Sequence, residues 1–225
     1  MNRASASPGK VSRAALELDH LLASKERKLL NSLTNPERIQ AYLDATPYST
    51  DPIYRAPLTV LRERRAHCFD GACFAALALA RLGHPPRLID MLPWDDDDHV
   101  LAIYKRGACF GSIAKSNFTG LRGREPVYRG LRELLMSYFE PFFNLAKNRT
   151  LRGYTRPLDL RRYDKQSWTH DDRTMEAIAQ GLDNSPKVQL FTPAQVRAFS
   201  KVDELTVRSN LWAADPAGLR KPKNR

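Results

Sequence analysis

The stretch 68–82, CFDGACFAALALARL, decides the fold, because almost every face of it is apolar when it is wound into an α-helix. A helix of this kind has no side to turn to water, so we expect it to lie inside the protein with other elements around it. Gly83 follows it, and Pro85 and Pro86 cannot continue a helix. The helix is therefore expected to end at about residue 82.

Three segments after this helix have the composition of β-strands, namely RLIDML (87–92), HVLAIYK (99–105) and ACFGSIA (108–114). A turn at 105–107 joins the last two, so these two are expected to pair. Helices are expected at 12–33, 36–45, 58–64, 127–140, 171–182 and from Thr192 onward. This order of elements predicts an α+β fold in which the buried helix packs on a small antiparallel sheet.

A chain of 225 residues, of which 42% are hydrophobic, can bury one core and carry a small appended subdomain. We expect this core at 35–145. A disordered lead-in at about 1–10 and a helical extension precede it within residues 1–34. A helical extension at 146–205, with one short strand VQLF at 188–191, and a basic tail at 206–225 follow it.

The sequence also indicates a compartment. No stretch approaches the roughly 20 apolar residues that a membrane span needs, and the basic, Ser- and Ala-rich N-terminus lacks the apolar segment of a signal peptide. The three cysteines are odd in number and lack paired spacing, which favours free thiols in a reducing cytoplasm. They also lack the spacing of a structural zinc site, and no motif indicates a cofactor. The oligomeric state stays open.

The formal net charge of +11 fits a polyanion as a partner. Basic and aromatic residues also mix in the segment 114–129, AKSNFTGLRGREPVYR, which suits an anionic substrate or a nucleic-acid backbone. No nucleic-acid-binding motif accompanies the charge. We therefore interpret it first as an ordinary solvated surface, with polyanion contact as the alternative.

Of the three cysteines, Cys68 has the position of a nucleophile. It lies where the Pro-rich approach ends and the buried helix begins, and a helix N-terminus favours the thiolate through unpaired N–H groups and the helix dipole. Cys73 lies about 140° further round the helix and deeper, and Cys109 is expected to pack in a strand. Asp70 would lie in the first turn, where helix capping and a role in a site are both open.

A nucleophilic cysteine needs a base within hydrogen-bond reach, and His99 at the start of a strand is the candidate. The acidic run 95–98 precedes it, and its negative field is expected to favour the imidazolium form. The run itself is interpreted as a solvated loop rather than a metal site. His67, next to Cys68 in sequence, is expected to be a surface residue.

These segments together resemble the transglutaminase-like proteins and the related bacterial cysteine peptidases. In that family a cysteine opens a buried helix and an acid follows two residues later, as in CFDGA (68–72), and the helix ends in a motif like LGHP (82–85). The family histidine begins the next strand, as in HVLAIYKRG (99–107), and the lead-in resembles TPY (46–48) and LTVL (58–61). The resemblance covers roughly residues 36–120. It implies a papain-like, transglutaminase-like core in which Cys68 and His99 are catalytic.

The sequence departs from the family at two points. Leu101 stands where the family often has a tryptophan, and Ala114 stands near the place of its third catalytic residue, usually an aspartate. Three polar residues nearby are candidates to orient His99, namely Ser112, Ser116 and Asn117. We choose Asn117, because an asparagine has this role in papain-like enzymes.

The sequence therefore predicts a cysteine enzyme that acts on an amide or peptide bond of a peptide or protein. Cys68 would attack the carbonyl, and His99 would take the thiol proton and return it to the leaving amine. Hydrolysis is expected rather than transfer to an amine, because nothing specifies a second amine substrate. The alternative is a non-catalytic module of the same fold that binds a protein or a polyanion.

Overall fold

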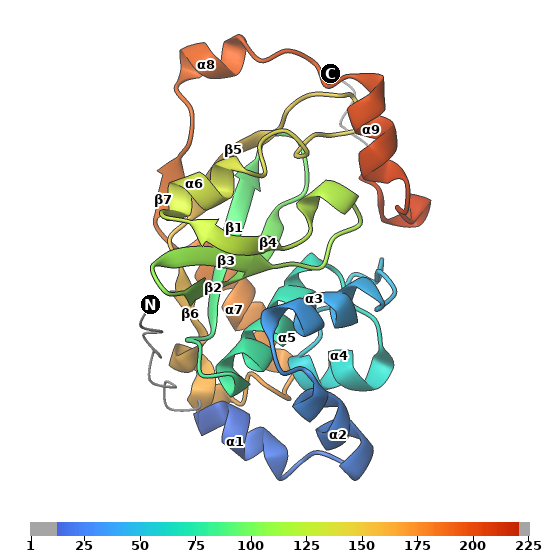
Figure 1. Ribbon diagram of the computed structural model, residues 1–225, viewed down its shortest axis with the longest axis vertical. Helices are drawn as coiled ribbons and strands as arrows, with labels where there is room; N and C mark the ends of the chain where they lie inside the picture. The colour runs from blue at the N-terminus through green and yellow to red at the C-terminus, as the bar shows by residue number, and fades with distance from the viewer. Residues whose placement is uncertain (1–12, 221–225) are drawn as a thin grey trace, which may run out of the picture.

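An antiparallel sheet separates two layers of helices in the computed structural model, which describes residues 13–220. Helices α1 to α5 pack with α7 on one face of the sheet, and α6 packs on the other (Figure 1). Both faces of the sheet are buried, and the fold is α+β as expected. The predicted disorder at 1–10 falls outside the described residues.

The sheet has the strand order β4-β3-β2-β1-β5-β7, and β6 also pairs with β1. The strands are β1 (Arg87–Pro93), β2 (His99–Arg106), β3 (Cys109–Ile113), β4 (Arg124–Tyr128), β5 (Leu151–Thr155), β6 (Leu158–Asp159) and β7 (Lys187–Gln189). β3 pairs with β2 as predicted, with Ala102 opposite Ile113. Along β2, Val100 and Ala102 face the layer that contains α5, while Leu101 and Ile103 face the other. This burial on both faces explains why β2 is an almost continuous apolar run.

Nine α-helices lie within the described residues. They are α1 (Arg13–Asp19), α2 (Ser24–Ser32), α3 (Pro36–Asp44), α4 (Pro57–Glu63), α5 (Cys68–Arg81), α6 (Leu131–Met136), α7 (Arg173–Asp183), α8 (Pro193–Arg197) and α9 (Glu204–Leu211). The described residues also contain three 3-10 helices, namely η1 (Thr119–Leu121), η2 (Leu160–Gln166) and η3 (Pro216–Gly218). No helix among residues 13–220 is both long enough and apolar enough to cross a membrane.

Helix α5 is enclosed as the sequence predicts, with every residue from 69 to 80 buried. Gly83 ends it with φ +86°, a left-handed conformation that glycine adopts without strain. At its start, the ring of His67 accepts a hydrogen bond from the Asp70 backbone N–H (3.4 Å), and the Asp70 carboxylate accepts one from the His67 backbone N–H (3.4 Å). His67 is thus the half-buried cap of α5 rather than the surface residue that was expected.

The sequence placed several boundaries wrongly. The helix expected at 12–33 is broken into α1 and α2, because Glu26 caps the Ala23 N–H and Arg27 binds the last carbonyl of α1 at Asp19. The helix expected at 127–140 is the edge strand β4 followed by the short α6. The segment 146–205, expected to be a helical extension, contributes β5, β6 and β7 to the same sheet. The segment 206–225, expected to be a basic tail, includes most of α9 and the whole of η3.

We expect Cys73→Ser to lower the free energy of unfolding by about 1–3 kcal/mol, because Cys73 is fully buried in the hydrophobic core and the substitution places a polar hydroxyl there. Cys109→Ser is the matched control, since Cys109 is half-buried at the start of β3, and its effect should stay within about 0.5 kcal/mol. Urea unfolding of both variants measures the difference. Equal losses of stability in the two variants would contradict the placement of Cys73 in the core.

Candidate active site

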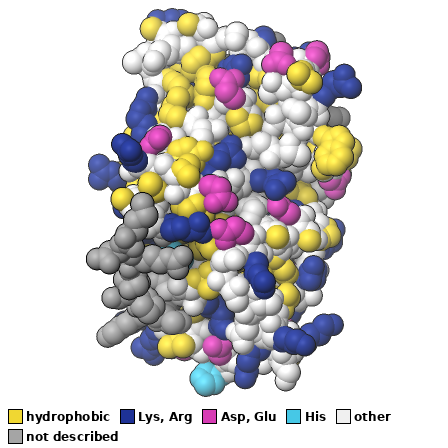
Figure 2. All heavy atoms as spheres, in the orientation of Figure 1, with side chains coloured by type: hydrophobic (Ala, Val, Ile, Leu, Met, Phe, Trp, Pro, Cys, Tyr) yellow, Lys and Arg dark blue, Asp and Glu magenta, His cyan; other side chains and the backbone are white. Residues whose placement is uncertain are grey.

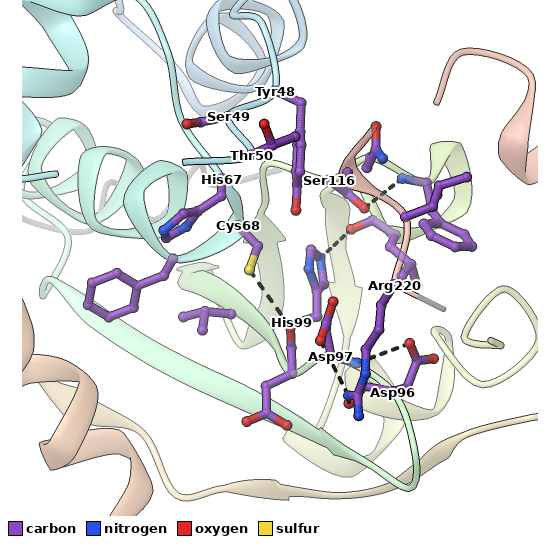
Figure 3. A pocket seen from close by; sticks show the side chains of 18 of the residues that line it. Tyr48, Ser49, Thr50, His67, Cys68, Asp96, Asp97, His99, Ser116 and Arg220 are labelled. Atoms are coloured by element: carbon purple, nitrogen blue, oxygen red, sulfur yellow. Dashed lines mark hydrogen bonds and ion pairs between the residues drawn. The ribbon is translucent and has the colours of Figure 1, made fainter. Parts of the chain in front are cut away.

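A pocket of about 590 Å³ opens where the N-terminus of α5 meets the start of β2. Cys68 and His99 both line it, and both side chains point into it in Figure 3. Other parts of the wall come from Tyr48 and its neighbours, the acidic residues 96–98, Asp90 of β1, the C-terminal part of α7, the η1 turn, residues 142–145 and the chain segment 217–220. Segments far apart in sequence therefore build one cavity.

Cys68 is the first residue of α5 and is half-buried. Its Sγ lies 3.8 Å from the carbonyl oxygen of Asp98, the residue directly before His99. Burial raises the pKa of the thiol to about 12, although the backbone N–H groups of Val100 and Phe69 act in the opposite direction. The resting site therefore holds a neutral thiol.

His99 is buried as the first residue of β2, and its ring packs edge-on against Phe142. Its Nε2 lies 2.8 Å from the carbonyl oxygen of Leu121. A carbonyl can only accept, so Nε2 carries the proton and Nδ1 is the ring nitrogen left to act as a base.

The charge on His99 differs from the expectation. Burial lowers the pKa of His99 to about 4, and the nearby Arg124 acts in the same direction. The acidic run was expected to favour the imidazolium, but loss of hydration outweighs its field. The acidic loop is also less solvated than expected, because Asp96 is half-buried and accepts a hydrogen bond from Thr150 (2.7 Å).

None of the three residues proposed to orient His99 is hydrogen-bonded to it. The Asn117 side chain exchanges two hydrogen bonds with the backbone of Asp215, both 2.8 Å. Ser112 is bonded to the Tyr138 hydroxyl (2.7 Å), and Ser116 accepts from the Phe118 N–H (3.0 Å). Ala114, near the family position of the third residue, has its backbone bound by Gln40. These bonds leave the Leu121 carbonyl as the group that holds the ring.

The η1 turn that carries Leu121 is fixed by α9. Asn210 on α9 accepts a hydrogen bond from the Gly120 N–H (2.9 Å), and Thr119 donates to the Ser209 carbonyl (2.9 Å). A side chain at Gly120 would collide with Asn210, so the two elements touch. Every residue has a backbone carbonyl, so the sequence cannot indicate which carbonyl holds the His99 ring. The role of Leu121 was therefore missed from the sequence.

Two more groups in and beside the pocket were not singled out from the sequence. Tyr48 points its hydroxyl into the pocket (Figure 3), and burial raises the pKa of this group well above its usual range, so it stays protonated.

The second group is the buried Arg55, which pairs with Glu63 (2.7 Å) and donates its backbone N–H to Asp70 (2.8 Å). Burial raises the pKa of Asp70 to about 7, and its two backbone hydrogen bonds at the start of α5 show a capping role.

The segment 215–220 contributes residues 217–220 to the wall of the pocket. Its Arg220 binds the carbonyl of Asp96 and pairs with Asp97 (3.3 Å), as Figure 3 shows for the labelled side chains. Gly218 packs against the ring of Tyr48, where a Cβ would come within 3.0 Å. Asn117 anchors the other end through Asp215. We expect this segment to limit access to Cys68, because residues 217–220 line the same pocket.

Comparison with known proteins finds only distant likeness. No family model matches the chain, and no curated protein is similar to it. Two structures of LapG from Legionella pneumophila are similar. One is 16% identical with a TM-score of 0.34 over 48% of this chain and 75% of LapG. The other, EGTA-treated, is 15% identical with a TM-score of 0.33 over 49% of this chain and 72% of LapG. Both TM-scores are too low for this likeness to assign a fold or a function to the chain.

Asn117→Ala should raise the rate at which iodoacetamide alkylates Cys68 by about 3- to 10-fold. The variant loses two hydrogen bonds that hold the segment 215–220, and each such bond is worth about 0.5–1.5 kcal/mol. Arg220→Ala, which frees the other end, should act in the same direction. Mass spectrometry of the Cys68 peptide gives the rates, with Cys109 as internal reference. A slower reaction in Asn117→Ala would instead support a role for Asn117 in activating the thiol.

Proposed function

We propose that the chain is a cysteine hydrolase with a papain-like, transglutaminase-like core that cleaves an amide or peptide bond in a peptide or protein. Cys68 is the nucleophile and His99 is its base. The observation that carries the proposal is the pocket in which a helix-opening thiol and a buried imidazole with one free ring nitrogen both point toward the same space.

The mechanism starts from a neutral pair, because burial raises the pKa of Cys68 and lowers that of His99. When the substrate carbonyl approaches, the thiol proton moves to Nδ1 of His99 as the sulfur attacks the carbonyl carbon. The Leu121 carbonyl, already bonded to Nε2–H, stabilises the imidazolium that forms. His99 then gives the proton to the leaving amine, and a water molecule, activated by His99, hydrolyses the thioester.

The negative charge that develops on the substrate oxygen needs hydrogen-bond donors. The Tyr48 hydroxyl is such a donor, since it points into the pocket and its raised pKa keeps the proton on it. The first N–H groups of α5 add partial positive charge at the same end of the pocket. We propose Tyr48 as the side chain that stabilises the oxyanion.

Binding of a polyanion is the weaker alternative. Figure 2 shows Lys and Arg side chains scattered among acidic and hydrophobic ones on the visible face, without one continuous basic patch. Three of the four basic residues of 114–129 also have structural partners. Lys115 is buried and donates to the Leu43 carbonyl (3.0 Å), Arg122 pairs with Asp44 (2.9 Å), and Arg124 lies over the Tyr138 ring (3.9 Å). These contacts favour the interpretation of the charge as ordinary surface and internal pairing.

Cys68→Ser should abolish hydrolysis of a denatured protein or a peptide library, by about 10³-fold or more, while the melting temperature stays close to that of the parent chain. His99→Gln should lower the rate by about 10²- to 10⁴-fold, since a glutamine cannot take the proton. Mass spectrometry of the cleavage products gives the rates. Wild-type cleavage by Cys68→Ser, or loss of its fold, would contradict the assignment of the nucleophile.

Tyr48→Phe should lower kcat by about 10²- to 10³-fold and leave KM nearly unchanged, because it removes a donor used mainly in the transition state. Tyr54→Phe is the matched control, since Tyr54 lines the same pocket but is 40% exposed. Steady-state kinetics on one peptide substrate measures both. A change in KM alone, or an equal loss in the control, would rule out the proposed role of Tyr48.

A further inference from the structure

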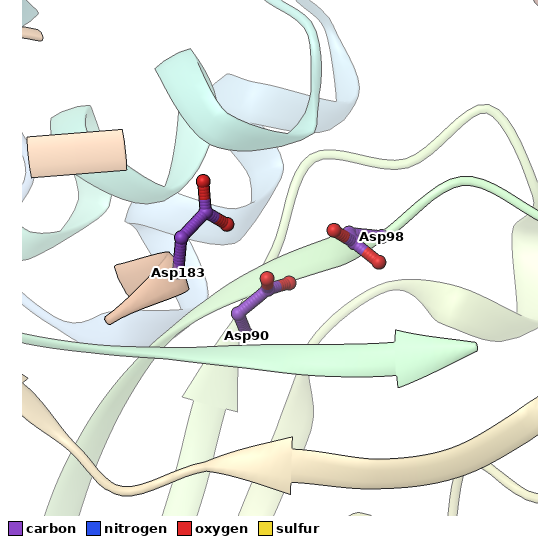
Figure 4. A group of neighbouring side chains, drawn as sticks. All are labelled: Asp90, Asp98 and Asp183. Atoms are coloured by element: carbon purple, nitrogen blue, oxygen red, sulfur yellow. The ribbon is translucent and has the colours of Figure 1, made fainter. Parts of the chain in front are cut away.

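Three aspartates from separate elements meet on the wall of the pocket. Asp90 lies in the middle of β1, Asp98 directly precedes β2, and Asp183 is the last residue of α7. One carboxylate oxygen from each lies within 4.8 Å of the other two. Figure 4 shows the Asp90 carboxylate between those of Asp98 and Asp183.

The central carboxylate has no partner of its own. Asp90 is only 3% exposed, and its Oδ1 is buried without a hydrogen bond. None of the ion pairs among residues 13–220 involves Asp90, Asp98 or Asp183. A buried, unpaired carboxylate is costly, and two more carboxylates beside it add repulsion.

The position of Asp183 makes the concentration of negative charge in this cluster still less favourable. It ends an 11-residue helix, where the helix dipole is negative and favours a cation over a carboxylate. Asp98 and Asp183 are exposed toward the pocket, so an ion could enter from that side and keep water or substrate oxygens as further ligands. The cluster therefore consists of one buried carboxylate and two exposed carboxylates, and it is open on the side of the pocket.

We propose that Asp90, Asp98 and Asp183 bind a divalent cation, and that this cation is Ca²⁺. All three donors are carboxylate oxygens, which hard cations prefer, while zinc prefers nitrogen and sulfur ligands. Ca²⁺ takes six to eight oxygens at about 2.3–2.6 Å, so two of its ligands lie at most about 5.2 Å apart, and the observed spacing of up to 4.8 Å falls within this limit. Mg²⁺ is usually held by one or two carboxylates and keeps several waters, so three carboxylates favour Ca²⁺.

The bound ion would join three parts of the fold. It would link the middle of β1 and the C-terminus of α7 to the residue before His99, whose carbonyl also contacts the sulfur of Cys68. The site is argued from the aspartates alone and does not depend on the proposed hydrolase activity. Its test therefore uses binding and stability, so that failure of either proposal can be told apart from failure of the other.

Calorimetric titration of the full chain with CaCl₂, after removal of metals, should give one site with a dissociation constant between about 10⁻⁶ and 10⁻³ M. At a hundredfold excess over this constant, Ca²⁺ should raise the melting temperature by about 5–10 °C. MgCl₂ should bind at least tenfold more weakly. No heat of binding and no thermal shift up to about 10 mM Ca²⁺ would overturn the site, and equal affinity for Mg²⁺ would overturn its assignment to calcium.

Asp98→Asn and Asp183→Asn should each weaken Ca²⁺ binding by tenfold or more, because each removes one charged ligand. Both residues are exposed, so the variants should fold, and their melting temperatures without metal verify this. Asp97→Asn is the matched control, since Asp97 is exposed in the same loop but outside the cluster, and it should bind as the parent chain does. Parent-like binding by both cluster variants, or an equal loss in the control, would overturn the proposal.

Discussion

Helix α5 has no face suited to water, and this constraint sets where the other elements lie. Its apolar surface is covered by helices of the N-terminal half on one side and by β1 and β2 of the sheet on the other. Its first turn reaches the pocket, at the edge of the sheet where β2 begins and the antiparallel β1 ends. Cys68 is therefore brought to the pocket by the same burial that forms the core, and the position of His99 follows from where β2 begins.

The same loss of hydration determines the charges in the pocket. It raises the pKa of Cys68 and lowers that of His99, so that the resting pair is neutral, and it keeps the Tyr48 hydroxyl protonated. A neutral pair suits a mechanism in which the proton moves as the substrate is attacked, rather than one that starts from a thiolate and an imidazolium. Local peptide groups then supply much of the polarity, namely the Leu121 carbonyl and the first N–H groups of α5.

The parts of the structure that were predictable are those with a local signal. The all-apolar run 68–82, the glycine that ends it and the hairpin of β2 and β3 were correctly placed, because periodicity and turn residues determine them. The joining of β5 and β7 to the sheet leaves no such signal, since short strands find their partners through tertiary contacts. Asn117 was chosen as a polar side chain near His99, yet a backbone carbonyl holds the ring. The acidic cluster was equally hidden, because Asp183 lies far along the chain from Asp90.

The division of the chain into a catalytic core and appended segments does not describe this site. Asn210 on α9 holds the η1 turn, and the carbonyl of that turn holds His99, so a helix more than 100 residues away in sequence determines where the ring of His99 points. Helix α9 itself is held by few apolar contacts, with Leu205 76% and Trp212 86% exposed at its two ends. Elements with little buried surface detach at a lower free energy than the core unfolds. The orientation of His99 is therefore only as stable as the docking of α9, even though Cys68 stands on the most deeply buried helix of the protein.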